Sequence, residues 1–369
     1  MSKSLNALGL MSGTSLDGID VALIRTDGEA EVRRGPAATF PYDPAQQTLL
    51  RDAVQEAKQL TARDQRPGIL AEAERQLTEW HAEAVARFLD LNGLTNSEVD
   101  VIGFHGQTVI HRPERRLTVQ LGDGPTLARR TGLPVVYDMR ANDVASGGQG
   151  APLVPVYHRA LAAGLAERPV ALVNIGGVAN MTWIGANGDL VAFDTGPGNA
   201  LLNDWCQRFT GEAFDRDGAM GALGKADSGI LEWLMSSAYF TTPAPKSLDR
   251  NGFDVAVLEG LSAEDGAATL TRFTAQAIAR SAPLVPQAPK LYVICGGGRL
   301  NPTLMRELRI LLETGARVVS AEDVNLNGDS MEAEAWAYLA VRCCNGLPIT
   351  FPGTTGAPEP LSGGLLAKP

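Results

Sequence analysis

The feature that most constrains the fold is a pair of apolar runs joined by a glycine-containing turn, which occurs twice along the chain. In chain order the runs are Leu5–Met11 and Ile19–Thr26, then Val170–Ile175 and Met181–Ile184. Gly13 lies in the first turn and Gly176 in the second, 163 residues later. Short apolar runs separated by Gly or Asp-Gly predict β-hairpins. We therefore expect two similar halves, each opening with a hairpin.

Strand-like and helical patterns alternate along the rest of the chain. Apolar residues three and four apart from Ala73 to Leu91 predict an amphipathic helix. Further strands are expected at Val99–Phe104, Val135–Tyr137, Leu190–Phe193 and Lys290–Cys295, and further helices at Leu270–Ala282, from Pro302 to about Thr314 with Asn301 as its N-cap, and at Ala333–Cys343. This alternation predicts an α/β fold.

A chain of 369 residues suits two domains of moderate size. The polar, glycine-rich stretch after residue 137 favours a boundary nearby, so we expect an N-terminal lobe over 1–135 and a C-terminal lobe over 136–369. The tail from Pro348 to Pro369 is rich in Gly and Pro. We expect it either to cross back to the first lobe or to lie along the surface.

Composition excludes several classes of function. There are 32 Lys and Arg against 42 Asp and Glu, a formal charge of −10, and no basic run, so a nucleic-acid partner is not expected. No apolar stretch reaches the roughly 20 residues that span a bilayer, and the N-terminus lacks an export signal. The four cysteines form no metal-ligand pattern. We expect a cytoplasmic protein without a membrane partner; a homodimer is one oligomeric state that the sequence leaves open.

The first turn, Gly13–Gly18, has the chemistry of a phosphate-binding loop. Glycines let backbone N–H groups approach an anion, and Thr14 and Ser15 add hydroxyl donors. It is not a Walker A loop, because no Lys follows the glycines and a strand comes next. By itself the segment is more typical of a plain hairpin with an Asp-Gly turn. Asp17 and Asp20 suit a hydrated Mg²⁺ or a turn-stabilising role.

Two other segments carry candidate chemistry. Gly296, Gly297 and Gly298 follow a buried strand and precede a helix, a place suited to nucleotide contact or to a tight turn. Asp194 ends a strand before a Gly-Pro-Gly-Asn turn, where its carboxylate suits a general base or a cap. Glu332 begins the last helix and forms with Asp194 a candidate carboxylate pair, or is a solvated helix-start residue.

Candidate sugar-binding residues come from the segments in between. His105 and Gln107 follow an apolar strand. Arg140 has the planar guanidinium that pairs with a carboxylate, such as a lactyl carboxylate. A loop His and a surface Arg are the alternatives.

Six segments together resemble one family, the anhydro-N-acetylmuramic acid kinases. They are, in chain order, Gly9–Gly18, His105–Thr108, Gly147–Leu153, Asn174–Asn180, Phe193–Asn199 and Cys295–Gly298. The resemblance spans nearly the whole chain, and the first and fifth segments are highly specific. It implies a two-lobed actin-like ATPase fold with a nucleotide cleft between the lobes, as in sugar kinases and heat-shock ATPases.

The resemblance also implies an activity and roles for residues. ATP and Mg²⁺ would serve a reaction in which water opens the 1,6-anhydro bridge of 1,6-anhydro-N-acetylmuramic acid and O6 takes the γ-phosphoryl group, giving N-acetylmuramic acid 6-phosphate in cell-wall recycling. Asp194 would activate water, with Glu332 near the sugar. The nucleotide-binding residues would be Gly13, Thr14, Ser15, Leu16, Asp17, Gly18, Ile19, Asp20, Gly176, Gly177, Gly296, Gly297 and Gly298, with Asp17 and Asp20 near the metal. The sugar-binding residues would be His105, Gln107, Arg140, Gly196 and Asn199.

One segment departs from the family pattern. Pro245–Arg250 begins as the family's Pro-Lys-Ser segment does, but Leu248 and Asp249 stand where Thr-Gly is commoner. No site residue is therefore assigned to this loop. Three other readings remain: an ordinary sugar kinase that deprotonates a free hydroxyl, an ATP-driven binding module, and a glycosidase that uses two carboxylates. The last leaves the glycine loops without a role.

Overall fold

The computed structural model describes residues 3–249, 252–312 and 315–369. The chain divides into two compact units, which we call unit 1, Met1–Ala163 with Ser330–Pro369, and unit 2, Gly164–Asp329. This division differs from the boundary expected at residue 135. The segment that follows residue 135 stays with unit 1, because buried Asp143 accepts hydrogen bonds from the Gly150 N–H and the Thr355 hydroxyl of the same unit.

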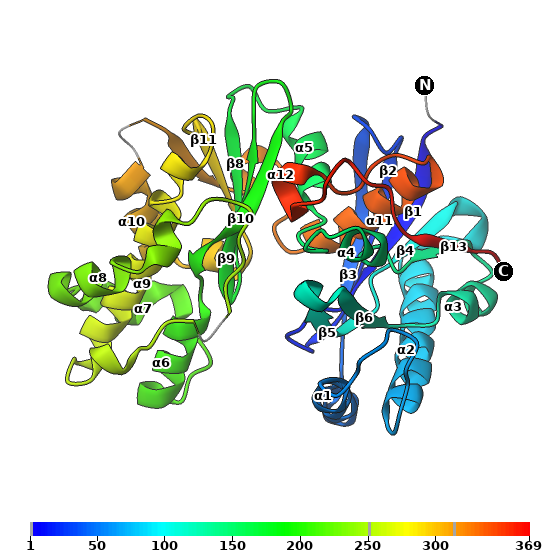
Figure 1. Cartoon of the computed structure of the whole chain (residues 1–369), viewed down its shortest axis with the longest axis horizontal. Coiled ribbons are helices and arrows are strands. Elements are labelled where there is room, and N and C mark those ends of the chain that lie inside the picture. Colours follow the sequence, from blue (N-terminus) through cyan, green and yellow to red (C-terminus); the bar gives the residue numbers. More distant parts are fainter. Residues whose placement is uncertain (1–2, 250–251, 313–314) are drawn as a thin grey trace. The chain divides into compact units, whose positions relative to one another are not determined.

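Unit 1 is built on a six-stranded mixed sheet, seen at the blue and cyan end of the chain in Figure 1. Its strands, in spatial order, are β13 (Leu365–Ala367), β7 (Val135–Tyr137), β4 (Val101–Phe104), β1 (Leu5–Met11), β2 (Gly18–Thr26) and β3 (Val32–Pro41). A separate hairpin joins β5 (Gln107–Arg112) and β6 (Leu117–Leu121). The C-terminal tail returns to this unit, since β13 pairs antiparallel with β7.

Helices cover both faces of this sheet, because its central strands are apolar on both sides. They are α1 (Pro44–Ala57), α2 (Leu70–Leu91), α3 (Gly124–Thr131), α4 (Ala141–Ala145), α5 (Pro155–Ala162), α11 (Met331–Cys344) and α12 (Pro352–Thr355). Leu8 and Phe104 belong to the buried cluster that residues of α1 and α2 complete. Alternate residues of a strand point to opposite faces. The residues next to Leu8 and Phe104, Gly9 and Gly103, accordingly face α11.

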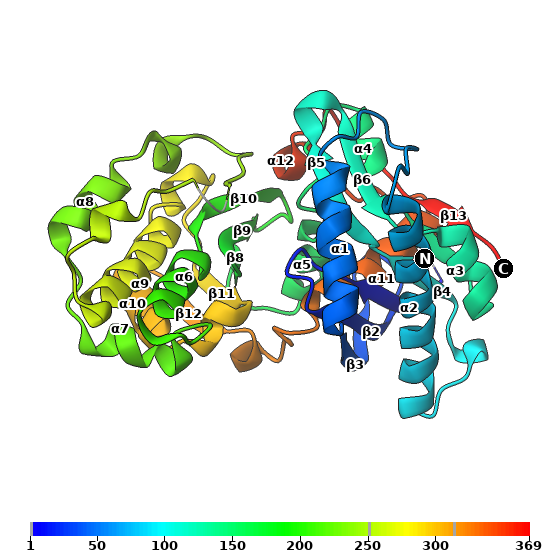
Figure 2. The same ribbon diagram turned by 90° about the horizontal axis from the view of Figure 1, so that it is seen from below.

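Unit 2 is built on a five-stranded sheet with the spatial order β10 (Leu190–Pro197), β9 (Val178–Ile184), β8 (Val170–Ile175), β11 (Leu291–Cys295) and β12 (Arg317–Ser320). Its helices are α6 (Ala200–Thr210), α7 (Ala219–Leu223), α8 (Ser228–Met235), α9 (Ala263–Ala279) and α10 (Pro302–Leu312). Figure 2 shows α9 running beside α10 and α6. Residues of α9 contribute to both buried clusters of the unit, one against the sheet and one among the helices.

The two sheets share one topology. In each, three consecutive strands form an antiparallel meander, β1–β2–β3 and β8–β9–β10. The first strand of each meander also pairs in parallel with the next strand of its sheet, β4 or β11, which pairs in parallel with β7 or β12. The prediction of two similar halves is confirmed. The α/β class is confirmed as well, and the duplicated order agrees with the actin-like arrangement expected from the sequence.

Several expected boundaries shift by a few residues. Helix α9 begins at Ala263 rather than Leu270, because the Ser262 hydroxyl accepts the Asp265 N–H and caps it there. Asn301 caps α10 by accepting the Leu304 N–H, as expected. The expected end of that helix at Thr314 lies outside the described residues, which show it to Leu312. None of the helices in the described part of the chain combines the length and apolar content of a bilayer crossing.

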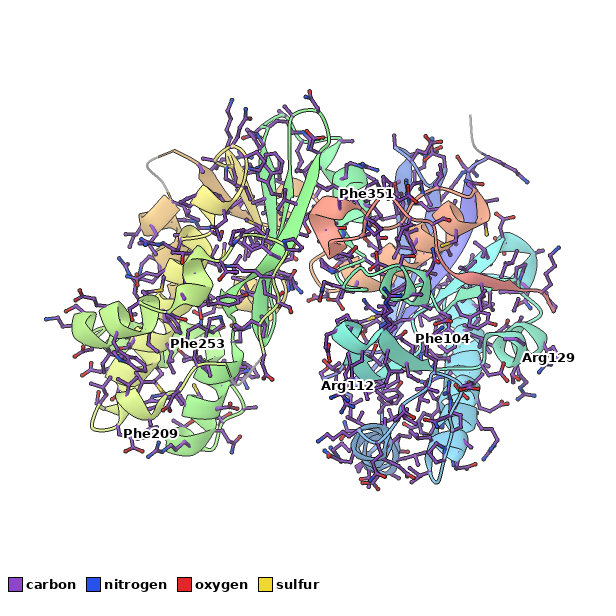
Figure 3. The ribbon with its side chains drawn as sticks, in the orientation of Figure 1. Phe104, Arg112, Arg129, Phe209, Phe253 and Phe351 are labelled. Carbon is purple, nitrogen blue, oxygen red and sulfur yellow. The ribbon has the colours of Figure 1, made fainter. Side chains whose placement is uncertain are left out.

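Aromatic packing marks the interior of each unit. Phe104 is 1% exposed in unit 1, and its ring contacts the His81 ring edge-on at 4.9 Å between centroids. In unit 2 Phe253 stacks on Phe240 at 5.4 Å and meets Phe273 edge-on at 5.1 Å. Figure 3 labels Phe104 and Phe253 among the side chains of their respective units.

Candidate active site

The β1–β2 turn in unit 1, predicted to bind phosphate, is exposed at its tip. Thr14, Ser15 and Asp17 are exposed, and the Ser15 hydroxyl donates to the Asp17 carboxylate at 2.9 Å. Leu16 adopts a left-handed conformation with φ of 57° and is 8% exposed. Its side chain therefore anchors the loop in the core, while Thr14 is exposed to solvent.

The next three residues of the predicted loop differ in exposure. Gly18 and Ile19 are buried, Ile19 at 2%, so their side-chain positions lie in the core. A Cβ on Gly18 would lie 2.6 Å from the Phe40 carbonyl oxygen, which only glycine avoids. Asp20 is half-buried and accepts a hydrogen bond from the Thr39 hydroxyl at 2.5 Å. Of these three, Asp20 alone brings a polar side chain.

His105 and Gln107 contact the backbone of the β1–β2 loop. The Gln107 amide is 0% exposed and donates to the Gly13 carbonyl oxygen at 3.2 Å, and the Ser12 hydroxyl donates to the Gly106 carbonyl oxygen. His105 Nδ1 lies 3.0 Å from the Ser12 carbonyl oxygen. Both predicted sugar-binding side chains are buried, and the contacts shown here connect them to the loop backbone.

Arg140 determines which nitrogen of His105 carries the proton. Its Nη2 lies 3.2 Å from His105 Nε2, so Nε2 accepts and Nδ1–H donates to Ser12. Burial, followed by the Arg140 charge, lowers the pKa of His105 well below its usual value, which keeps the ring neutral. Arg140 also donates to the Gly150 carbonyl oxygen at 2.8 Å, and its guanidinium lies 5.2 Å from the Trp336 ring centroid.

Glu332 lies in the first turn of α11 and shares an electrostatic environment with Arg140, Asp17 and Asp20. Desolvation raises the pKa of Glu332, the Arg140 charge lowers it, and the two aspartates raise it. Burial lowers the pKa of Arg140 to about 10, while Glu332 opposes that change. The fold of unit 1 thus brings together four charged candidates that are up to 315 residues apart in sequence, because α11 packs directly against β1.

Asp194 in unit 2 is held at an irregularity of β10. The β9–β10 register shifts between Asp194 and Gly196, and the Thr195 hydroxyl donates to the Ala179 carbonyl oxygen. Bulges commonly redirect side chains beside active sites. The half-buried Asp194 carboxylate accepts the Leu248 N–H at 2.8 Å. Burial raises the pKa of Asp194 to about 6, opposed by that hydrogen bond and by the Lys246 charge.

The Gly176–Gly177 turn of unit 2 lies against the turn at Gly198 and Asn199, and the neighbouring Ile175 contacts Gly298 of the third glycine turn. The Asn199 N–H donates to the Gly176 carbonyl oxygen at 2.7 Å, and the Gly198 N–H to Gly177 at 3.0 Å. A Cβ on Gly298 would lie 2.4 Å from Ile175 Cγ2, so this approach requires glycine. Asn199 occupies the N-cap position of α6, but its side chain donates to the Ile175 carbonyl oxygen instead of capping the helix.

A cavity of about 470 Å³ opens beside these turns. Its lining residues are Asn199, Leu202, Asn203, Phe214, Asp215, Arg216, Asp217, Gly297, Leu300 and Asn301. The volume suits a drug-sized ligand. Gly297 is exposed there, and Phe214 and Leu300 are 48% and 63% exposed. Leu202, Phe214 and Leu300 were not predicted as site residues, although Leu300 lies only two residues after Gly298.

Gly196 lies inside unit 2 rather than at an open surface. It is buried, and a Cβ there would lie 2.6 Å from the Ala277 side chain. Its proposed contact with sugar would therefore involve the backbone. Among the described residues, no group of three or more His, Cys, Asp or Glu side chains is arranged to hold a metal ion.

Comparisons with known proteins identify the family of the chain. Residues 5–368 match the family described as anhydro-N-acetylmuramic acid kinase. A protein of that name from Agrobacterium fabrum is 52% identical over 372 residues, covering 100% of both chains. Another from Bradyrhizobium diazoefficiens is 54% identical over 366 residues, covering 99% of this chain and 100% of its own.

Solved structures are similar at a lower level. Component A of (R)-2-hydroxyglutaryl-CoA dehydratase from Acidaminococcus fermentans has a TM-score of 0.47 at 13% identity, covering 92% of this chain and 98% of its own. A ROK family glucokinase from Streptomyces griseus, in complex with glucose and AMPPNP, has a TM-score of 0.42 at 14% identity, covering 91% and 99%. From the full-length sequence matches, the chain belongs to the anhydro-N-acetylmuramic acid kinase family, and is an ATP-dependent kinase.

Proposed function

We propose that this protein uses ATP and water to convert 1,6-anhydro-N-acetylmuramic acid to N-acetylmuramic acid 6-phosphate, in the recycling of cell-wall sugars. Water adds to C1, the C1–O6 bond breaks, and O6 takes the γ-phosphoryl group of ATP, leaving ADP. One proton of the water goes to Asp194. The observation that supports this most is the carboxylate of Asp194 at the β10 bulge, half-buried and with its pKa raised to about 6.

A base with a pKa near 6 suits proton abstraction at neutral pH. It is ionised at pH 7, yet it is more basic than an ordinary aspartate and so accepts a proton from water more readily. Strain in the bicyclic acetal favours ring opening. The carboxylate is oriented by the Leu248 N–H, which leaves its other oxygen for water.

Each unit, taken by itself, contains residues suited to a nucleotide. In unit 1 the exposed Thr14 and Ser15 offer donors to phosphate oxygens. In unit 2 the 470 Å³ cavity, with apolar Leu202 and Phe214, suits the adenosine. Asp17 and Asp20 fit a Mg²⁺ ion, which usually takes one or two carboxylates and completes its shell with phosphate oxygens and water. When bound, the ion would offset negative charge on the phosphates.

Glu332 and Arg140 would serve the sugar. The Glu332 carboxyl and the Arg140 guanidinium interact electrostatically in unit 1. A carboxylate suits sugar hydroxyls, and a guanidinium suits a lactyl carboxylate. Glu332, with a raised pKa, would accept a hydrogen bond from a sugar hydroxyl. Half-buried Arg140, with buried His105 and Gln107, would keep the loop and Glu332 in place.

The test is a reaction in oxygen-18 water with ATP, Mg²⁺ and the anhydro sugar, quenched rapidly and analysed by mass spectrometry. We expect a phosphorylated product with one label at C1. Unlabelled N-acetylmuramic acid 6-phosphate in the same labelled water measures exchange at the anomeric centre. A phosphorylated sugar that keeps its anhydro bridge would instead indicate an ordinary sugar kinase, and the proposal would be abandoned.

A further inference from the structure

Three residues of unit 2 form a closed hydrogen-bonded circuit around Asp194. The Asp194 N–H donates to the Lys246 carbonyl oxygen at 3.0 Å. The Lys246 ammonium donates to the Tyr239 carbonyl oxygen at 2.6 Å. The Tyr239 hydroxyl donates to the Asp194 carbonyl oxygen at 2.6 Å. Each residue is thus both a donor and an acceptor. Both the N–H and the carbonyl oxygen of Asp194 are hydrogen-bonded, so the backbone that carries its side chain is fixed.

The ammonium of Lys246 is fixed within this circuit by aromatic rings. It lies 4.3 Å from the Tyr239 ring centroid and 5.6 Å from that of Phe193. A cation at these distances is attracted to the ring faces. The side chain is half-buried, and burial lowers the pKa of Lys246 to about 8, while the Asp194 charge opposes that shift. At neutral pH the ammonium is therefore mostly charged and confined beside Asp194.

We propose that Lys246 is a positioning residue for the proposed reaction: its ammonium joins the Pro245–Asp249 loop to Tyr239 and so keeps the carboxylate of Asp194 oriented for proton transfer. The inference rests on the proposed role of Asp194 as the base. The same loop supplies the Leu248 N–H that binds Asp194 Oδ2, so loss of the Lys246 anchor frees both contacts.

Lys246 acts on Asp194 through charge as well as geometry. In the described part of unit 2, the titratable groups that face the Asp194 carboxylate are Lys246 and Tyr239. Tyr239 is neutral at physiological pH, because burial and the Asp194 charge raise its pKa further above its usual value. Lys246 is accordingly the cation that favours ionised Asp194, and its removal raises the pH at which Asp194 takes a proton.

The test compares Lys246→Met with Lys246→Arg, and uses Lys225→Met, a change of an exposed lysine in unit 2, as the matched control. For Lys246→Met we expect kcat to fall by about 100-fold, the effect of a misplaced catalytic group, with KM for ATP and sugar within about two-fold of wild type. The acid limb of the kcat/KM profile should move to higher pH. Lys246→Arg should restore that limb because the charge is kept, and Lys225→Met should change neither quantity.

Tyr239→Phe provides an independent measurement. It removes the hydroxyl that binds the Asp194 carbonyl oxygen but keeps the ring beneath the ammonium. We expect kcat to fall while the acid limb stays in place, since no charge is lost. This variant and Lys246→Gln carry the test if Lys246→Met does not fold, which circular dichroism would show. Wild-type kcat and an unmoved acid limb in folded Lys246 variants would overturn the inference.

The failure of this inference is distinguishable from the failure of the proposed function. Asp194→Asn is measured first in the same assay. Full turnover by Asp194→Asn would remove the proposed base, and both proposals with it. Inactive Asp194→Asn together with a Lys246→Met enzyme of wild-type kcat and pH profile would leave the proposed function standing and reject only the role of Lys246.

Discussion

At the scale of single residues, the chemistry depends on how the fold changes ordinary side chains. An exposed aspartate titrates near 3.9, whereas burial at the β10 bulge raises the pKa of Asp194 to about 6. In unit 1 burial has the opposite effect on a basic side chain, because it lowers the pKa of Arg140 to about 10. Two consequences concern Asp194 directly.

Replacement of Asp194 by Asn should remove the base but keep the shape and most hydrogen bonds. We expect kcat to fall by about 100- to 10,000-fold, the usual contribution of a general base. Nucleotide affinity, measured by calorimetry, should stay within about two-fold of wild type. Asp189→Asn, a change of an exposed aspartate in the β9–β10 turn, is the matched control and should retain full activity. Lost nucleotide binding with retained turnover would contradict the assignment.

The pH dependence should follow the same carboxylate. Asp194 accepts a proton only when ionised, so kcat/KM should be constant above its pKa of about 6 and fall tenfold per pH unit below it. The measurement is a kcat/KM profile from pH 5 to 8 with saturating ATP, and Asp189→Asn should give the same curve. A rate that stays constant down to pH 5 would show that another group is the base.

At the scale of elements, the most demanding contact is that of α11 with the unit 1 sheet. Gly9 and Gly103 are paired neighbours on β1 and β4. A Cβ on Gly9 would lie 1.7 Å from the Ala333 carbonyl oxygen, and one on Gly103 would lie 2.0 Å from that of Trp336. The helix therefore approaches the sheet over two glycines, and this approach places Glu332 and Trp336 beside the β1–β2 turn.

Gly9→Ala should push α11 away from the sheet. Because backbone rather than a flexible side chain blocks the Cβ, we expect a loss of at least about 2 kcal/mol in the free energy of unfolding, with lower activity from displaced Glu332. Denaturant titration and kcat measure these two effects. Gly315→Ala is the control, because its Cβ would meet nothing within 4 Å. Equal stability of both variants would contradict the described packing.

At the scale of the whole molecule, the two units differ in their response to acid. All four histidines lie in unit 1. Burial lowers the pKa of His81 and of His158 to about 4, and that of His105 well below its usual value. Below pH 6.5 the unfolded chain binds protons that these folded sites exclude, so unit 1 loses stability as the pH falls from about 6.5 toward 4.

Unit 2 contains no histidine in its sequence, and Asp194 acts in the opposite direction. Its raised pKa means that the folded state binds a proton first, so this group favours folded unit 2 as the pH falls from about 6 to 3.8. The raised pKa of Glu332 likewise favours folded unit 1 as the pH falls. It is a single group, however, and several histidines of unit 1 act in the opposite direction. The molecule should therefore lose structure in unit 1 first as it is acidified.

Hydrogen exchange from pH 7 to 5, corrected for intrinsic rates, should show lost protection in α2 and α5 before β8–β11. His81→Leu provides the matched change, since His81 is fully buried and its Nε2 has no hydrogen-bond partner in the described structure. Removal of this titration should reduce the pH dependence of unit 1 stability by about one proton. Equal loss of protection in both units would contradict this assignment.

Much of the fold followed from local patterns. The runs at Leu5–Met11 and Val170–Ile175 become β1 and β8 with the predicted bounds, because apolar alternation and turn glycines act over a few residues. Asp194 was identified as a candidate because it follows a strand and precedes a glycine turn. No pattern indicated β13 or the end of unit 1 at Ala163, since β13 pairs with β7 more than 200 residues earlier in the chain.

Local patterns along the chain were sufficient to predict the elements, the two similar halves and the chemical types of the candidate residues, because these depend on neighbouring residues. The folded structure was needed to show that Lys246 and Tyr239 hold Asp194, that His105 and Gln107 support a loop, and that α11 brings Glu332 to Arg140. Those arrangements depend on packing between distant segments. Side-chain burial, and with it each altered pKa, exists only once that packing has formed.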